Sequence, residues 1–182
     1  MKITCVAGLS GSGKSTLCEA MIAEGTVRRE DVYDDVFRGI AHTPDELANR
    51  VRATLAAGRD CVLTDVTFCD PWERHQLEEM LARLAPDAEV VWLFFENTPE
   101  TCLANMRGRA LAEIDDALAR MQESLAYVQR DTQLYLIPPG ARTLPVARPA
   151  VGMQGLVLKA LLWLGYGKPA PGQIAGDVRE AG

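Results

Sequence analysis

The sequence predicts an α/β domain in which helices cover both faces of a parallel sheet, with a small helical lid. Three observations carry this prediction. Short apolar runs alternate with helical patterns, several of these runs end in an acidic residue, and three helical patterns begin with Thr or Asp followed by Pro. The 182 residues suffice for one such domain, predicted over 1–165, and a mobile tail is predicted over 166–182.

The first predicted strand, at 3–7, leads into a glycine-rich stretch that matches G-x-x-x-x-G-K-[ST], the P-loop pattern. A helical pattern follows directly, as this motif requires. Backbone N–H groups can wrap a phosphate chain only where side chains are small and positive φ is allowed, and glycine meets both conditions. We therefore expect Mg-ATP, or a close relative, to be bound by Gly8, Ser10, Gly11, Ser12, Gly13, Lys14, Ser15 and Thr16.

Three residues have predicted roles toward the nucleotide. The ammonium of Lys14 should reach the β- and γ-phosphates, and the hydroxyl of Ser15 should ligate Mg²⁺. Asp65 closes an apolar strand and could bind a water of the metal, so it is a second metal candidate. Alternatively, Asp65 only caps the loop that follows its strand.

The other elements follow in chain order. Further strands are predicted at 31–33, 61–65 and 90–95, and short extended pieces broken by prolines at 135–140 and 143–146. Helices are predicted to start at 43, 70 and 98, to run over 113–129, and to close the domain over 156–164. The candidate lid covers about 98–130, with a break between two helices at Gly108.

Composition limits the classes of function. The net charge of −6 and the lack of a Lys/Arg-rich run disfavour a long footprint on duplex nucleic acid, whereas a nucleic-acid end or a small molecule fits. The apolar run 156–167 is too short to span a bilayer, and a membrane-surface helix is its alternative. Five scattered cysteines, and a first strand that follows directly on Met1-Lys2, favour a reduced, cytoplasmic protein without signal peptide.

Charged residues after the second strand and on the candidate lid could act on an acceptor. Asp34 or Asp35 could take the proton of an attacking hydroxyl, and Arg38 could hold an anionic substrate group. Alternatively, the aspartate only caps a short helix and Arg38 is a solvated surface residue. Arg107 and Arg109 could stabilise charge on a transferred phosphoryl group, or could be ordinary surface residues.

Together these motifs resemble the P-loop kinases around bacteriophage polynucleotide 5′-hydroxyl kinase and the zeta-toxin group. The resemblance covers roughly residues 1–140, and beyond the P-loop it is carried by Asp35-Val36-Phe37-Arg38, Thr64-Asp65-Val66-Thr67, Arg74 and Pro99-Glu100. It implies that Asp35 is the catalytic base and that Arg38 contacts substrate phosphate. Ala104 departs from the pattern, because such kinases often carry a lid arginine near this position.

The sequence therefore predicts an ATP- and Mg²⁺-dependent kinase whose acceptor is a nucleic-acid or nucleotide-related hydroxyl. No N-K-x-D pattern follows the later strands, which disfavours a GTPase. A kinase for a nucleoside, sugar or antibiotic is one alternative. A non-kinase ATP-binding regulator with a partner on the apolar segment 151–166 is another.

Overall fold

The computed structural model of the chain describes residues 1–34, 44–110, 133–146, 160–161 and 163–165. In this part of the chain, five parallel strands form one sheet in the order β2-β3-β1-β4-β5. The predicted parallel sheet is confirmed. The strands are β1 (Lys2–Ala7), β2 (Val32–Asp34), β3 (Cys61–Asp65), β4 (Glu89–Phe95) and β5 (Thr143–Leu144).

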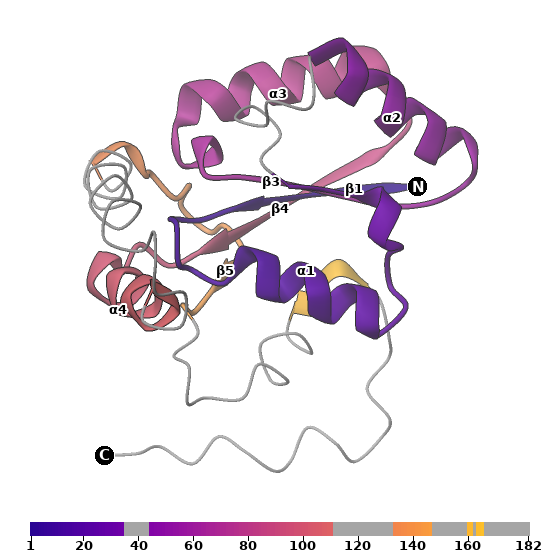
Figure 1. Ribbon diagram of the computed structural model, residues 1–182. Helices are drawn as coiled ribbons and strands as arrows, with labels where there is room; N and C mark the ends of the chain where they lie inside the picture. Colours follow the sequence, from indigo (N-terminus) through magenta and orange to yellow (C-terminus); the bar gives the residue numbers. More distant parts are fainter. Residues whose placement is uncertain (35–43, 111–132, 147–159, 162, 166–182) are drawn as a thin grey trace.

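Helices cover both faces of the sheet, as predicted. α1 lies on one face, and α2 and α3 lie on the other (Figure 1). α4 lies beside the end of the sheet at which the loop after β1 is found. The helices of the described residues are α1 (Lys14–Ala23), α2 (Pro44–Ala56), α3 (Pro71–Leu84) and α4 (Pro99–Ala110), with 3₁₀ turns η1 (Arg29–Asp31) and η2 (Thr67–Cys69).

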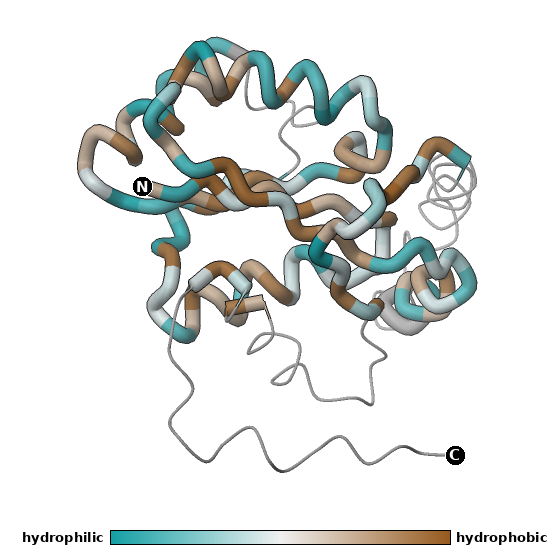
Figure 2. Tube along the Cα trace, turned by 180° about the vertical axis from the view of Figure 1, so that it is seen from behind, coloured by the Kyte–Doolittle hydropathy of each residue, from teal (hydrophilic) through white to brown (hydrophobic). Residues whose placement is uncertain are grey.

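The core lies between the sheet and its helices. Apolar residues follow the strands, whereas hydrophilic residues lie on the outer faces of the helices (Figure 2). Leu47, Val51 and Leu55, which the sequence pattern places on one face of α2, are all buried. Burial raises the pKa of the Cys18 and Cys61 thiols to about 12, so they stay protonated and act as apolar filler.

Local sequence signals explain the start of α3, as predicted, and the end of α1. Asp70 caps α3 by accepting a hydrogen bond from the N–H of Trp72 at 2.8 Å. α1 ends at Ala23, and Gly25 follows with a φ of +71°. The predicted break at Gly108 is wrong, because α4 continues to Ala110. A single internal glycine costs a helix only about 1 kcal/mol relative to alanine, which neighbouring contacts can offset.

A buried polar network fixes the start of β2, which begins one residue later than predicted. Asp31 belongs to η1 and is only 1% exposed. Its carboxylate accepts hydrogen bonds from Arg59 Nε at 2.7 Å, Arg59 Nη2 at 2.9 Å and Thr54 Oγ1 at 2.7 Å. The hydroxyl of Tyr33 lies 2.8 Å from Thr54 Oγ1. The network therefore joins η1 and β2 to α2 and to the turn before β3.

The C-terminal helix is described at four of its predicted residues, Ala160, Leu161, Trp163 and Leu164, and these are helical. Ala160 and Leu164 are buried in the core. Arg142 Nη1 donates to the carbonyl of Trp163 at 2.7 Å, and the Lys2 ammonium donates to the carbonyl of Leu164. These contacts agree with the predicted packing of the C-terminal helix on the rest of the domain. Among the described residues, the helices are all too short or too polar to cross a bilayer.

Candidate active site

The P-loop connects β1 to α1 at the carboxyl ends of the strands. β1 is flanked by β3 on one side and by β4 on the other, so the loop lies where the strand order reverses. Such switch points form the ligand-binding crevice of open α/β sheets. Gly11 and Gly13 have φ values of +82° and +108°, a conformation that residues with a side chain rarely adopt. The two glycines are therefore required by the backbone path.

The amino end of α1 follows directly on the P-loop and directs its first backbone N–H groups toward it. Its first intrahelical hydrogen bond runs from the N–H of Leu17 to the carbonyl of Gly13 at 2.9 Å, ahead of which lie the N–H groups of Lys14, Ser15 and Thr16. The N-cap residue Gly13 has no side chain, and the first turn contains no acidic residue. α2, α3 and α4 all carry acidic residues there. The positive end of the α1 dipole is thus left for an external anion.

Lys14 and Ser12 shape the loop in different ways. Lys14 Nζ donates to the carbonyls of Gly8 at 2.7 Å and Leu9 at 3.2 Å, so its charge lies across the loop. The N–H of Ser12 donates to the carbonyl of Leu9 at 3.0 Å. The buried hydroxyl of Ser12 has no hydrogen-bond partner among the described residues. The nucleotide contacts of Ser12, like those of Ser10 and Thr16, remain predictions.

Two carboxylates lie at the ends of neighbouring strands. Asp34, the last residue of β2, accepts a hydrogen bond from the hydroxyl of Ser15 at 3.3 Å. Asp65 closes β3, is fully buried, and accepts a hydrogen bond from the N–H of Thr67 at 2.8 Å. The capping role left open for Asp65 is therefore present, and its metal role remains a prediction. Ser15 and Asp34 together offer oxygen ligands of the kind that Mg²⁺ prefers.

α4 packs directly on the P-loop. Asn105 Nδ2 donates to the carbonyl of Gly11 at 2.9 Å. A Cβ atom built on Gly11 would lie 2.3 Å from the carbonyl oxygen of Cys102 and 2.8 Å from Cγ of Met106. Sequence reasoning missed Asn105. Its spacing of three residues from the buried Cys102 places both on one face of the helix, and this was the available signal.

The remaining predicted site residues are only partly described. Arg107 lies exposed on α4. Asp35, Arg38 and the side chain of Arg109 lie outside the described residues. Their roles as base, phosphate contact and lid arginine therefore remain predictions.

Replacing Gly11 by alanine is expected to weaken nucleotide binding at least tenfold. The added methyl group meets the backbone of α4, which cannot move aside like a flexible side chain, and the left-handed φ adds strain of about 1–2 kcal/mol. Gly58→Ala is the matched control, since Gly58 has a φ of +70° but open space around its Cβ position. Titration calorimetry with a non-hydrolysable ATP analogue measures both. Equal affinities for the two variants would contradict the close α4 packing.

Arg74, one of the residues that carry the kinase resemblance, has a structural position. It is 7% exposed and donates to the carbonyls of Phe68 at 2.7 Å, Cys69 at 3.0 Å and Leu136 at 2.7 Å. These bonds join the start of α3 to the segment before β5. These structural contacts therefore account for the presence of an arginine at this position without a contact to substrate.

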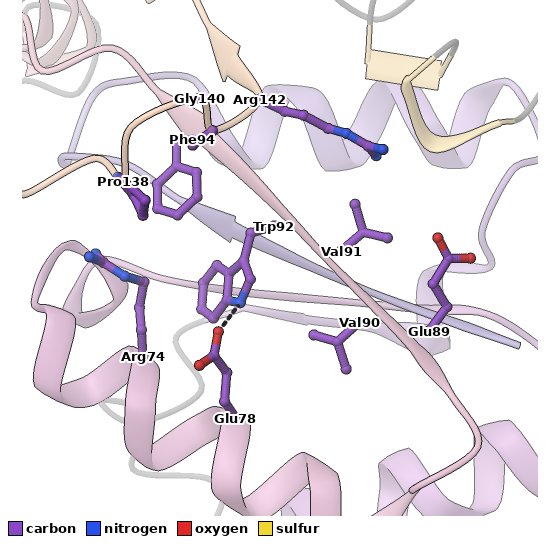
Figure 3. A pocket seen from close by; sticks show the side chains of 11 residues that line it. Arg74, Glu78, Glu89, Val90, Val91, Trp92, Phe94, Pro138, Gly140 and Arg142 are labelled. Carbon is purple, nitrogen blue, oxygen red and sulfur yellow. Dashed lines mark hydrogen bonds between the residues drawn. The ribbon is translucent and has the colours of Figure 1, made fainter.

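A cavity of about 410 Å³ lies between α3 and β4 (Figure 3). Arg74 and Glu78 line it from α3, Trp92 lines it from β4, and the chain from Pro138 to Arg142 closes another side. Trp92 Nε1 donates to Glu78 at 2.7 Å across it. Its lining residues belong to other segments than the P-loop, so this cavity is separate from the phosphate site.

The fold and the loop together define a P-loop α/β protein. The chain matches the family described as AAA domain (AAA_33) over residues 3–130 and belongs to this family. A comparison with curated proteins found no match.

Solved structures give the same picture of the fold. The protein APE1195 has a TM-score of 0.54 and 17% identity, over 90% of this chain and 95% of that chain. Shikimate kinase from Bacteroides thetaiotaomicron has a TM-score of 0.52 and 12% identity, over 90% and 98%. APS kinase CysC from Mycobacterium tuberculosis, in complex with AMPPNP and APS, has a TM-score of 0.47 and 18% identity, over 90% and 97%. The first two likenesses show that this chain shares its fold with APE1195 and with a shikimate kinase.

Proposed function

We propose that this chain is an ATP- and Mg²⁺-dependent kinase that transfers the γ-phosphoryl group to a hydroxyl. The contact between Ser15 Oγ and Asp34 Oδ2, at 3.3 Å, carries this proposal. Nucleotide binding alone requires only the P-loop and the amino end of α1. A carboxylate beside the loop adds what phosphoryl transfer needs, a partner for the metal or an acceptor for the proton of the attacking hydroxyl.

The residues divide into three tasks. The N–H groups of the loop and the first turn of α1 hold the phosphates, and the Lys14 ammonium offsets their charge. Ser15 and Asp34 are the proposed holders of Mg²⁺, which when bound would neutralise charge on the terminal phosphates. Asp35 is the proposed base for the hydroxyl and Arg38 the proposed contact for an anionic acceptor group.

For the acceptor, we propose a nucleic-acid or nucleotide-related hydroxyl. The resemblance to polynucleotide kinases supports this choice. Trp72 also supports it, because it is 65% exposed in the first turn of α3, which follows the carboxyl end of β3. An exposed indole is a surface on which a base can stack. The net charge of −6 instead favours a small-molecule acceptor such as a nucleoside, sugar or antibiotic.

An acceptor screen separates these possibilities. Purified protein is supplied with γ-labelled ATP and Mg²⁺, and then with 5′-hydroxyl oligonucleotides or with a panel of nucleosides, sugars and antibiotics. Label in oligonucleotide supports the proposed acceptor, and label in a small molecule supports the second. If neither set of acceptors is labelled although ATP binds, the kinase proposal is refuted and the chain is better explained as a non-kinase ATP-binding regulator.

Asp34→Asn is expected to lower kcat by about 10²- to 10⁴-fold, because the amide is a weak metal ligand and a poor proton acceptor. Asp87→Asn is the control, since Asp87 is exposed in the turn that leads into the amino end of β4. The Mg²⁺ dependence of the rate assigns the role of Asp34. Recovery at high Mg²⁺ indicates a metal ligand, whereas a loss that is independent of Mg²⁺ indicates the base. Asp35→Asn is measured alongside. An unchanged rate in both variants would refute the proposed roles of Asp34 and Asp35 as metal ligand and base.

A further inference from the structure

Tyr135 closes the junction from which the P-loop starts. The ladder between β1 and β4 has its last pair at Ala7 and Phe94. At this end of the ladder, the Tyr135 hydroxyl donates to the carbonyl of Ala7 at 3.1 Å and to the carbonyl of Phe95, the residue after the last pair. One proton is shared by two acceptors that belong to different strands. The phenol thus joins β1 and β4 where their own pairing has ended.

Phe95 transmits this link to the loop. A Cβ atom built on Gly8 would lie 2.9 Å from Cβ of Phe95, and one built on Gly13 would lie 3.7 Å from its ring. Phe95 is fully buried, so its ring forms the floor under both ends of the glycine-rich stretch. The position of Phe95 relative to Ala7 therefore sets the shape of the loop.

The surroundings of Tyr135 make it a fixed donor. Its side chain is 3% exposed, and burial raises the pKa of its hydroxyl far above the usual value, so the proton is retained at all ordinary pH. The next residue, Leu136, is tied to α3 through Arg74 at 2.7 Å, and the Tyr135 carbonyl accepts from Asn97 Nδ2 at 3.5 Å. The backbone at Tyr135 and Leu136 is thus held by two side chains, independently of the Tyr135 hydroxyl.

We infer that Tyr135 is a positioning residue for nucleotide binding, which acts by locking the carboxyl ends of β1 and β4 under the P-loop. This inference rests on the proposed function, since it assumes that the loop binds ATP. Tyr135 touches backbone carbonyls and no reacting group. Its loss should therefore weaken the binding of nucleotide and leave the chemical step nearly unchanged.

The test compares Tyr135→Phe with Tyr33→Phe. Tyr33 in β2 is also a buried tyrosine, but its hydroxyl is hydrogen-bonded to Thr54 of α2, away from the β1–β4 junction. The Kd of Mg-AMPPNP, measured by calorimetry well below the melting temperature, is expected to rise about fivefold to tenfold in Tyr135→Phe. It should stay within about twofold in Tyr33→Phe. Once an acceptor is identified, KM for ATP should rise in Tyr135→Phe while kcat changes by less than about twofold.

Each outcome has one meaning. Wild-type protein that does not bind Mg-AMPPNP refutes the proposed function itself. Wild-type protein that binds, together with an unchanged Kd in Tyr135→Phe, refutes the positioning role, even if the melting temperature falls. If Tyr135→Phe does not fold, ¹⁹F-tyrosine labelling of the full chain gives the answer, with signals assigned through variants of the other tyrosines. The Tyr135 signal must then shift on addition of Mg-AMPPNP, and a static signal refutes the inference.

Discussion

Replacing Lys14 by methionine is expected to lower kcat/KM for ATP by about 10²- to 10³-fold while the fold is retained. The Lys14 ammonium bonds the carbonyls of Gly8 at 2.7 Å and Leu9 at 3.2 Å, which places a positive charge over the loop that should cradle the phosphates. Charge developing on the transferred group loses this stabilisation in the variant, and a single preorganised donor is worth a loss of this size. Turnover with labelled ATP measures the effect.

Lys14→Arg tests whether the site needs a compact charge. The ammonium lies between two carbonyl oxygens, whereas a planar guanidinium presents a broad fork of donors. We expect a loss of at least about tenfold, although the charge is kept. Arg83→Met is the control for simple removal of a cation, because Arg83 is exposed in the last turn of α3. Full activity in Lys14→Met would overturn the assignment of the P-loop as the ATP site.

The elements that local chemistry decides were predictable. β3 spans the predicted 61–65, since an unbroken apolar run that ends in Asp65 is typical of a buried parallel strand. Asp70-Pro71 starts α3 because the capping side chain and its N–H partner are two residues apart. β2 shifted by one residue because Asp31 is held by Arg59, 28 residues away, and no local pattern reveals such a contact.

The candidate site likewise has one part that local sequence predicts and another that depends on contacts between distant segments. The path of the P-loop follows from its glycines and from the helix behind it, so its residues could be named from the motif. The contact between Asn105 and Gly11 spans 94 residues, and that between Tyr135 and Ala7 spans 128. Both depend on how α4 and the chain before β5 pack on the finished sheet. Sequence periodicity reports which face of an element is apolar, but not which element covers it.

The largest expected change in stability comes from Arg59→Met, about 3 kcal/mol in the free energy of unfolding. Asp31 is 1% exposed, and removing Arg59 leaves its charge buried with Thr54 as the remaining described donor. Arg29→Met is the matched control, because Arg29 bonds Glu19 through two donors at 2.7 and 2.6 Å on the surface. An exposed pair contributes about 0–1 kcal/mol, so this variant should change stability little. Urea unfolding at pH 7 measures both.

The pH dependence of this difference identifies the Asp31 charge as its cause. The hydrogen bonds from Arg59 hold the pKa of Asp31 below its usual value, so the pair stabilises the fold above the unfolded pKa of about 4. This stability is lost as the pH falls through the lower, folded pKa. The gap between wild type and Arg59→Met should thus be widest near neutral pH and narrow in acid. A gap that stays constant from pH 7 to below pH 3 would instead assign the loss to packing of the Arg59 side chain.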